Sequence, residues 1–137
     1  YRYCPRQRSN MNVVDSSAWL SYFAGDKNSA HFAKPIEAID ELLVPSITLT
    51  EVFKNVLRQR NEELAFEAIA HMEQGNVIAL DGELAINAAR LGVELKLPLA
   101  DSIIYATAQK YEAIVWTQDA DFKGLDGVKF YPKAKAT

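Results

Sequence analysis

Short apolar runs alternate along the chain with longer segments in which apolar residues recur every three or four positions. The short runs predict buried strands, and the longer segments predict amphipathic helices. The expected strands occupy residues 12–15, 43–47, 76–80, 114–116 and 128–131. Strand and helix alternate throughout, which is the pattern of a parallel sheet covered by helices on both faces. We therefore expect an α/β fold.

Capping residues and glycines indicate where the helices begin and end. Ser16 and Ser17 would cap a first helix that ends at Gly25. Further helices are expected in residues 27–42 (one or two pieces), after Thr48, in residues 61–74 and 82–95, and from Asp101 in a first helical turn. The helix after Thr48 and the next one would pair as a helical hairpin.

Composition limits the class of protein. The chain has 137 residues, of which 49% are hydrophobic and 24% are charged, and this balance is typical of one globular domain with a buried core. Its apolar runs are far shorter than the roughly 18 residues that a membrane-spanning helix needs. We therefore expect a soluble, cytoplasmic protein with no membrane association.

The first ten residues, YRYCPRQRSN, differ from the rest of the chain. They carry three arginines, no acid and the only cysteine. We interpret residues 1–10 as a leader or cloning-derived segment and residues 11–137 as a single domain. Without those three arginines the formal net charge changes from −3 to −6. The remaining domain would lack disulfide and thiolate chemistry, and it would bind nucleic acid poorly unless metal ions or a basic rim offset its charge.

Four acids stand just after an expected strand or at an expected helix start: Asp15, Glu51, Asp101 and Asp119. Ligands of open α/β sheets bind at the carboxyl ends of the strands, so the topology could bring these carboxylates to one edge. Carboxylates that close together cannot all remain ionised unless cations lie between them or some take up protons. Oxygen ligands without histidine or cysteine favour Mg²⁺ or Mn²⁺ over Zn²⁺. A pair of such ions promotes phosphodiester hydrolysis.

Glu51 and Asp101 also have a purely structural explanation. Thr48 and Glu51 form a T-x-x-E pattern, in which the glutamate accepts the N–H of the N-cap residue. An aspartate such as Asp101 satisfies free backbone N–H groups at a helix start. Asp81 is fully explained as the N-cap of the helix over residues 82–95, so it ranks below the four acids. Sequence alone leaves both explanations open for Glu51 and Asp101.

The segments MNVVDSSAWL, TLTEVF, LPLADSIIYATAQ and VWTQDADF resemble, in order and context, the four acidic motifs of PIN-domain ribonucleases. The resemblance is specifically to the VapC toxins of VapBC toxin–antitoxin systems, and it extends from Met11 to about Tyr131. It implies a three-layer α/β/α fold with a central parallel sheet. It also implies Mg²⁺- or Mn²⁺-dependent cleavage of RNA, inhibition by a cognate VapB-like antitoxin, and a homodimer.

The resemblance carries over residue by residue to the candidate site. The catalytic, metal-binding acids of the family match Asp15, Glu51, Asp101 and Asp119. Asp121 matches a position that is acidic only in some members, so we treat it as auxiliary. Ser17 and Thr117 match small hydroxyl residues that often support the site.

Two other classes place acids at strand ends. A receiver-like signalling module also binds Mg²⁺ there, but it usually has two adjacent acids after one strand and a lysine at a late strand end, whereas Asp15 is followed by two serines. A D-x-D phosphatase would need an aspartate where Ser17 stands. A catalytically silent PIN fold that serves only as a protein-interaction platform remains an alternative.

Basic residues near the motifs are candidates for contacts with RNA phosphates. They are Lys54, Arg58, Arg60, Lys96, Lys110 and Lys123. Most charges of this kind belong to solvated helix faces, so sequence does not separate the members of this set.

Overall fold

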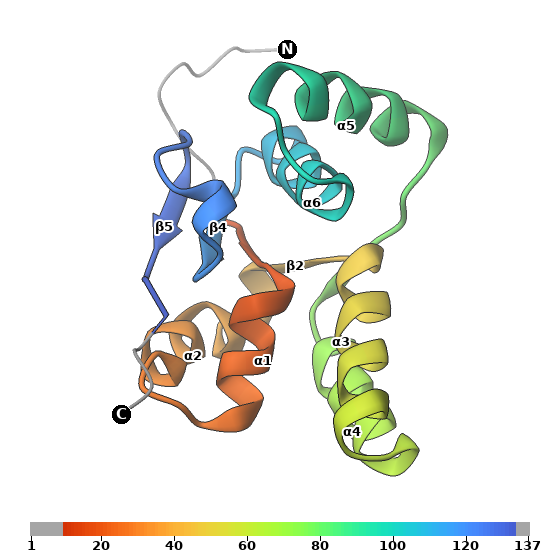
Figure 1. Cartoon of the computed structure of the whole chain (residues 1–137), viewed down its shortest axis with the longest axis vertical. Helices are drawn as coiled ribbons and strands as arrows, with labels where there is room; N and C mark the ends of the chain where they lie inside the picture. The colour runs from red at the N-terminus through yellow and green to blue at the C-terminus, as the bar shows by residue number, and fades with distance from the viewer. Residues whose placement is uncertain (1–9, 134–137) are drawn as a thin grey trace.

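A five-stranded sheet forms the centre of the molecule in the computed structural model, which describes residues 10–133 (Figure 1). Its strands are β1 (Asn12–Val14), β2 (Leu42–Pro45), β3 (Asn76–Ile78), β4 (Ile114–Thr117) and β5 (Val128–Phe130). They lie in the order β3-β2-β1-β4-β5, and each neighbouring pair is parallel. Residues 1–10 were expected to be a leader or cloning-derived segment. Residues 1–9 of this segment lie outside the described residues.

Helices connect the strands in this part of the chain. They are α1 (Ser16–Ala24), α2 (Ser29–Glu37), α3 (Ser46–Gln59), α4 (Glu62–Met72), α5 (Gly82–Leu95) and α6 (Leu99–Lys110), with 3₁₀ turns η1 (Ile39–Glu41) and η2 (Ala120–Phe122). Figure 1 shows α5 and α6 together on one side of the sheet, and α1 and α2 on the other, with α3 and α4 as a hairpin beside α1. The predicted α/β/α layers are therefore confirmed, as is the hairpin.

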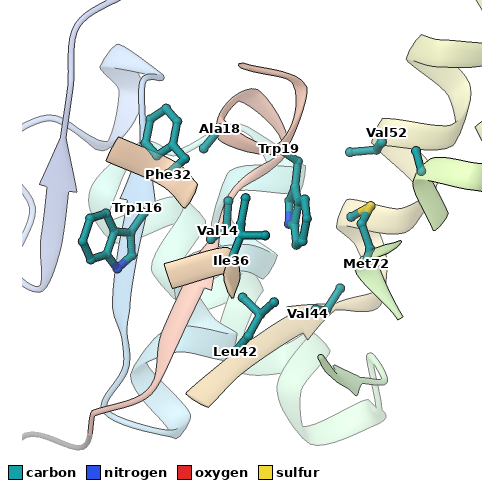
Figure 2. Packing of buried hydrophobic residues seen from close by; sticks show 11 residues of the cluster. Val14, Ala18, Trp19, Phe32, Ile36, Leu42, Val44, Val52, Met72 and Trp116 are labelled. Carbon is teal, nitrogen blue, oxygen red and sulfur yellow. The ribbon is translucent and has the colours of Figure 1, made fainter. Parts of the chain in front are cut away.

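Alternation along the strands divides the core into two layers. Val14, Val44 and Trp116 point to one face, where they pack with Trp19 of α1 and Met72 of α4 (Figure 2). The preceding residue of each strand points to the opposite face and packs with Ile104 and Tyr105 of α6. Because successive side chains of a strand point to opposite faces, each apolar strand contributes to both cores.

Two expected helix starts are wrong. α1 is capped by Asp15, whose extended backbone (φ −76°, ψ 171°) lets its carboxylate accept the N–H of Ala18, so Ser16 and Ser17 already belong to the helix. The capping box at Glu51 is absent, because β2 ends at Pro45 and α3 begins at once with Ser46. The Thr48 hydroxyl instead donates to the carbonyl of Pro45 at 2.7 Å. Glu51 therefore lies in the interior of the helix, without the capping role.

None of the helices in residues 10–133 has the length and apolar character needed to cross a membrane. The strand order also bears on the rival fold. A receiver-like module has the order 2-1-3-4-5, whereas the order here is β3-β2-β1-β4-β5. The receiver-like alternative is therefore wrong.

Candidate active site

One cavity of about 350 Å³ gathers all four predicted acids in its wall. Asp15 directly follows β1, and Asp119 lies two residues after β4, the neighbouring parallel strand. Asp101 stands in the first turn of α6, and Glu51 comes from α3, which packs against α1. Parallel strands end at the same edge, so the topology brings together four carboxylates that are far apart in sequence.

Asp15 is the most deeply buried of these acids, with 2% of its surface exposed. The Ser17 hydroxyl donates to its Oδ1 at 2.8 Å, and the Ala18 N–H donates to the same oxygen at 3.1 Å. Burial raises the pKa of Asp15 from 3.8 to about 7, although the hydrogen bonds from Ser17, Ala18 and Thr117 act in the opposite direction. The carboxyl group is thus held rigidly where its negative charge is poorly solvated.

Asp101 is destabilised as an anion by its neighbours as well as by burial. Its pKa is raised to about 8, first because burial desolvates the carboxylate and then because Asp119 lies close to it. The carboxylates of Asp15 and Asp121 contribute further repulsion. A cation that binds between these carboxylates would offset their mutual repulsion.

The tightest acidic group consists of Asp101, Asp119 and Asp121. One carboxylate oxygen from each lies within 4.8 Å of the other two. Asp119 Oδ1 also accepts the N–H of Asp121 at 2.9 Å, which fixes the turn that carries both residues. Asp121, which was expected to be auxiliary, belongs to this group, and Asp15 and Glu51 line the same cavity as Asp101 and Asp119. Oxygen donors at this spacing fit a hard divalent cation.

Ser17 and Thr117, the two hydroxyl residues expected to be auxiliary, connect the ends of β1 and β4. The Ser17 oxygen accepts the N–H of Gln118 at 3.3 Å, while its hydroxyl donates to Asp15. Thr117 is fully buried, and its side-chain oxygen accepts the N–H of Asp119 at 2.8 Å. The turn after β4 is therefore tied to the start of α1.

Ser16 is a site residue that the sequence reasoning treated only as a cap. Its hydroxyl donates to Glu51 Oε1 at 2.5 Å, and it links α3 to the start of α1. The available signal was its position directly after Asp15. Because the hydrogen bond crosses 35 positions of sequence, its partner could be known only from the packing of α3 against α1.

Two of the six candidate cations line the cavity: Lys54 and Arg58 of α3. Asn55, which the sequence analysis did not select, lines it as well. Arg60 lines a neighbouring groove of about 740 Å³ between α1 and the α3–α4 hairpin. Leu20 and Asn55 line both spaces, so the acidic cavity and the groove adjoin each other.

The metal-free protein should lose stability as the pH rises from about 4 to about 8. In this range the folded state binds more protons than the unfolded chain, because folding raises the pKa of Asp15 to about 7 and that of Asp101 to about 8. The free energy of unfolding therefore falls with increasing pH. Melting curves recorded in EDTA across this range would measure the slope, which should be shallower in Asp101→Asn. Equal slopes in the two proteins would contradict the assignment.

Comparison with known proteins identifies the fold. The sequence matches the PIN domain family over residues 13–128, whereas no curated protein sequence matches it significantly. A toxin-antitoxin complex from Klebsiella pneumoniae contains a chain that is 26% identical, with a TM-score of 0.73 over 89% of this chain and 99% of that one.

Two further solved structures are similar in fold. DNA-bound VapBC from Salmonella typhimurium is 15% identical, with a TM-score of 0.70 over 90% of this chain and 98% of that one. Mycobacterium tuberculosis VapC20, described as a Sarcin-Ricin loop cleaving toxin, is 19% identical, with a TM-score of 0.71 over 85% and 96% of the two chains. The resemblance predicted from the four acidic motifs is therefore confirmed, and the chain belongs to the PIN-domain family.

Proposed function

We propose that this protein is a Mg²⁺- or Mn²⁺-dependent endoribonuclease and the toxin of a type II toxin–antitoxin system. The observation that supports this most strongly is the single cavity that collects Asp15, Glu51, Asp101 and Asp119 in a PIN-domain chain. Similar folds occur in toxin-antitoxin complexes, and one similar protein is described as a Sarcin-Ricin loop cleaving toxin. The reaction is hydrolysis of an RNA phosphodiester bond.

The proposed roles follow from where each acid lies. Asp101, Asp119 and Asp121 would hold a divalent cation, because their oxygens converge within 4.8 Å. Asp15 and Glu51 would complete the ligand set from the end of the neighbouring strand β1 and from α3. When bound, Mg²⁺ or Mn²⁺ would make water more acidic and stabilise charge on the phosphate oxygens. Ser16, Ser17 and Thr117 keep the carboxylates in place through the hydrogen bonds described above.

Metal removal tests the proposed activity directly. Purified protein should cleave single-stranded RNA in Mg²⁺ or Mn²⁺, lose this activity in EDTA and regain it when the metal is restored. The products should be separated on a denaturing gel, and a protein purified in parallel with Asp101→Asn controls for contaminating nucleases. Cleavage that persists in EDTA, or that is equal in the variant, would refute the proposal and leave the catalytically silent PIN fold as the better explanation.

We further propose a cognate VapB-like antitoxin that uses the groove beside the acids. Apolar residues in the lining of this groove include Leu20, Phe23, Val56 and Leu64. It reaches the acidic cavity at Leu20 and Asn55. A helix or strand of the partner could pack in the groove and extend an arginine or lysine over the shared edge. A guanidinium group can bind a carboxylate through two hydrogen bonds, so such a side chain would compete with both metal and RNA.

Antitoxin binding should become weaker when Mg²⁺ is present. The partner is expected to be a short protein encoded next to the toxin, to copurify with it and to suppress its cleavage of RNA. If its cationic side chain occupies the metal site, calorimetry should give tighter association in EDTA than in Mg²⁺, since the two cations exclude each other. An affinity that does not respond to Mg²⁺ would restrict the partner to the apolar groove and eliminate direct competition.

We also propose that the protein forms a homodimer, as the family resemblance implies. Exposed apolar residues on the outer side of α5 and at the start of α6 support this. Ile86, Val93 and Leu99 have 59%, 84% and 79% of their surface exposed. A second copy of the chain would cover them.

A further inference from the structure

One wall of the cavity that holds the predicted acids carries two cations beside Glu51. α3 contributes four of the residues that line it: Glu51, Lys54, Asn55 and Arg58. These residues are spaced at three, four and seven positions along the helix, so they lie on one helix face. Three aspartates line the cavity from the ends of β1 and β4 and the start of α6. A phosphate group that enters would meet three aspartates on one side, and two cations with Glu51 on the other.

We propose that Lys54 and Arg58 bind successive phosphates of the RNA strand, so that α3 forms the phosphate-binding wall of the site. This inference rests on the proposed ribonuclease function and names the residues that position its substrate. A helix rises 1.5 Å per residue, which places Lys54 about 4.5 Å and Arg58 about 10 Å from Glu51 along the axis of α3. Lys54 therefore contacts the phosphate nearest the acids, and Arg58 contacts the next one.

The charge distribution explains why such a wall is needed. The chain has a formal net charge of −3, and the cavity gathers four carboxylates, so RNA is repelled unless cations lie within reach. Of the six basic residues that the sequence offered, Lys54 and Arg58 are the two that line this cavity. The planar fork of an arginine binds two phosphate oxygens, and a lysine supplies a compact charge.

Exposure leaves these two cations accessible to a phosphate. Both side chains lie at the surface, where an ion pair with a nearby acid contributes little to stability. A phosphate can therefore replace an acidic neighbour without a large cost. Contacts of this kind go to the sugar–phosphate backbone, which fixes the position of the strand without reading its bases. A test can therefore use RNA of any sequence.

Salt dependence of RNA binding tests the wall separately from catalysis. A short fluorescent single-stranded RNA is bound to the protein in Ca²⁺, in place of Mg²⁺, and its anisotropy is followed over a range of KCl concentrations. Each phosphate contact on a single strand contributes about 0.7 to the slope of log K against log [salt]. Lys54→Gln and Arg58→Gln should therefore each reduce the steepness of the slope by about 0.7.

Two matched variants control for a general loss of positive charge. Arg60→Gln changes the same charge two residues further along the chain, at the C-cap of α3, where the side chain lines the neighbouring groove. Lys110→Gln changes a lysine in the last turn of α6, at the opposite end of that helix from Asp101. Neither variant should change the slope by more than a small part of the roughly 0.7 expected for one phosphate contact.

The outcomes separate the wall from the proposed function. Unchanged slopes in both Lys54→Gln and Arg58→Gln overturn the wall, whether or not the wild-type protein cleaves RNA. If both variants have reduced slopes but the wild-type protein does not cleave RNA, the phosphate-binding wall is supported and the proposed ribonuclease function is refuted. If the wild type cleaves, both variants should raise KM about tenfold or more and change kcat less, because they remove binding in ground and transition state alike.

A purely structural role for these cations would leave a different signature. If Lys54 and Arg58 served only to neutralise the acids, their removal would enhance the rise in melting temperature that Mg²⁺ produces and leave the salt slope unaltered. That combination overturns the inference. The expected result is a changed slope with a melting temperature and a Mg²⁺-induced shift equal to those of the wild type.

Discussion

Replacing Asp101 by asparagine should lower RNA cleavage by about 10²–10³-fold, the usual effect of removing one charged or polar group that acts on the transition state. Asp101 belongs to the tightest acidic group, and its carboxylate is largely buried. Asparagine has the same shape but carries no charge, so it would be a poor ligand for a divalent cation. Initial rates of cleavage in saturating Mg²⁺ would measure the loss.

The same substitution should have the opposite effect on stability when metal is absent. At pH 8 the wild-type protein must hold Asp101 partly ionised beside Asp119, and this costs folding free energy. The neutral amide removes that repulsion, so Asp101→Asn should melt several degrees higher than the wild type in EDTA. Mg²⁺ should then raise the melting temperature of the wild type much more than that of the variant, because a ligand stabilises only the protein that binds it.

Asp81→Asn provides a matched control for Asp101→Asn. Asp81 also follows a strand, but it caps α5 by accepting the N–H of Leu84 at 2.9 Å. Asparagine is an equally good N-cap, so this variant should keep wild-type activity and the full response to Mg²⁺. An equal Mg²⁺-induced shift in wild type and Asp101→Asn would show that Asp101 is not part of a metal site.

The sheet and its edge could be predicted from sequence because they depend on local patterns. Each strand is a short apolar run between polar residues, and alternation of strand with helix leaves few topologies other than a parallel sheet. Once the sheet is parallel, residues that follow strands, such as Asp15 and Asp119, must lie at one edge. The placement of Asp15 and Asp119 in one cavity follows from the same topology, whereas Glu51 and Asp101 come from helices that pack beside this edge.

Contacts between distant segments could not be predicted in this way. The hydrogen bond from Ser16 to Glu51 depends on how α3 packs against α1, and no local pattern encodes that packing. Asp121 joins Asp101 because the turn after β4 directs it back toward α6. Lys54 lines the cavity and Lys110 does not, because only the helix face that carries Lys54 meets the cavity. The sequence shows two lysines near the motifs and does not distinguish them.

The false capping box shows how tertiary structure changes a local pattern. Thr48 and Glu51 have the right spacing, but Pro45 ends β2 and α3 begins one residue later. The helix therefore starts before the threonine, and Thr48 is fully buried with its hydroxyl bonded to the Pro45 carbonyl. Glu51 is left free to contribute its charge to the cavity, which strengthens its assignment as a functional residue.

Changing Glu51 to glutamine should lower cleavage by about 10²-fold or more while leaving the melting temperature almost unchanged. Glutamine favours helix as much as glutamate does, and its side-chain oxygen can still accept the Ser16 hydroxyl. The change therefore removes the negative charge and keeps the packing and the hydrogen bond. Cleavage rates normalised to folded protein, together with calorimetric melting curves, would separate the two effects.

Ser16→Ala distinguishes the charge of Glu51 from its orientation. This variant retains the carboxylate but removes the hydroxyl that holds it at 2.5 Å, so it should lower cleavage by about 10-fold, as expected for a residue that orients a ligand. The double variant Ser16→Ala/Glu51→Gln should cleave RNA as fast as Glu51→Gln alone. A residue that acts only through another has no further effect once that other residue is inactive. If Glu51→Gln instead melts early and retains normal activity per folded molecule, Glu51 serves the structure of α3 and not the reaction.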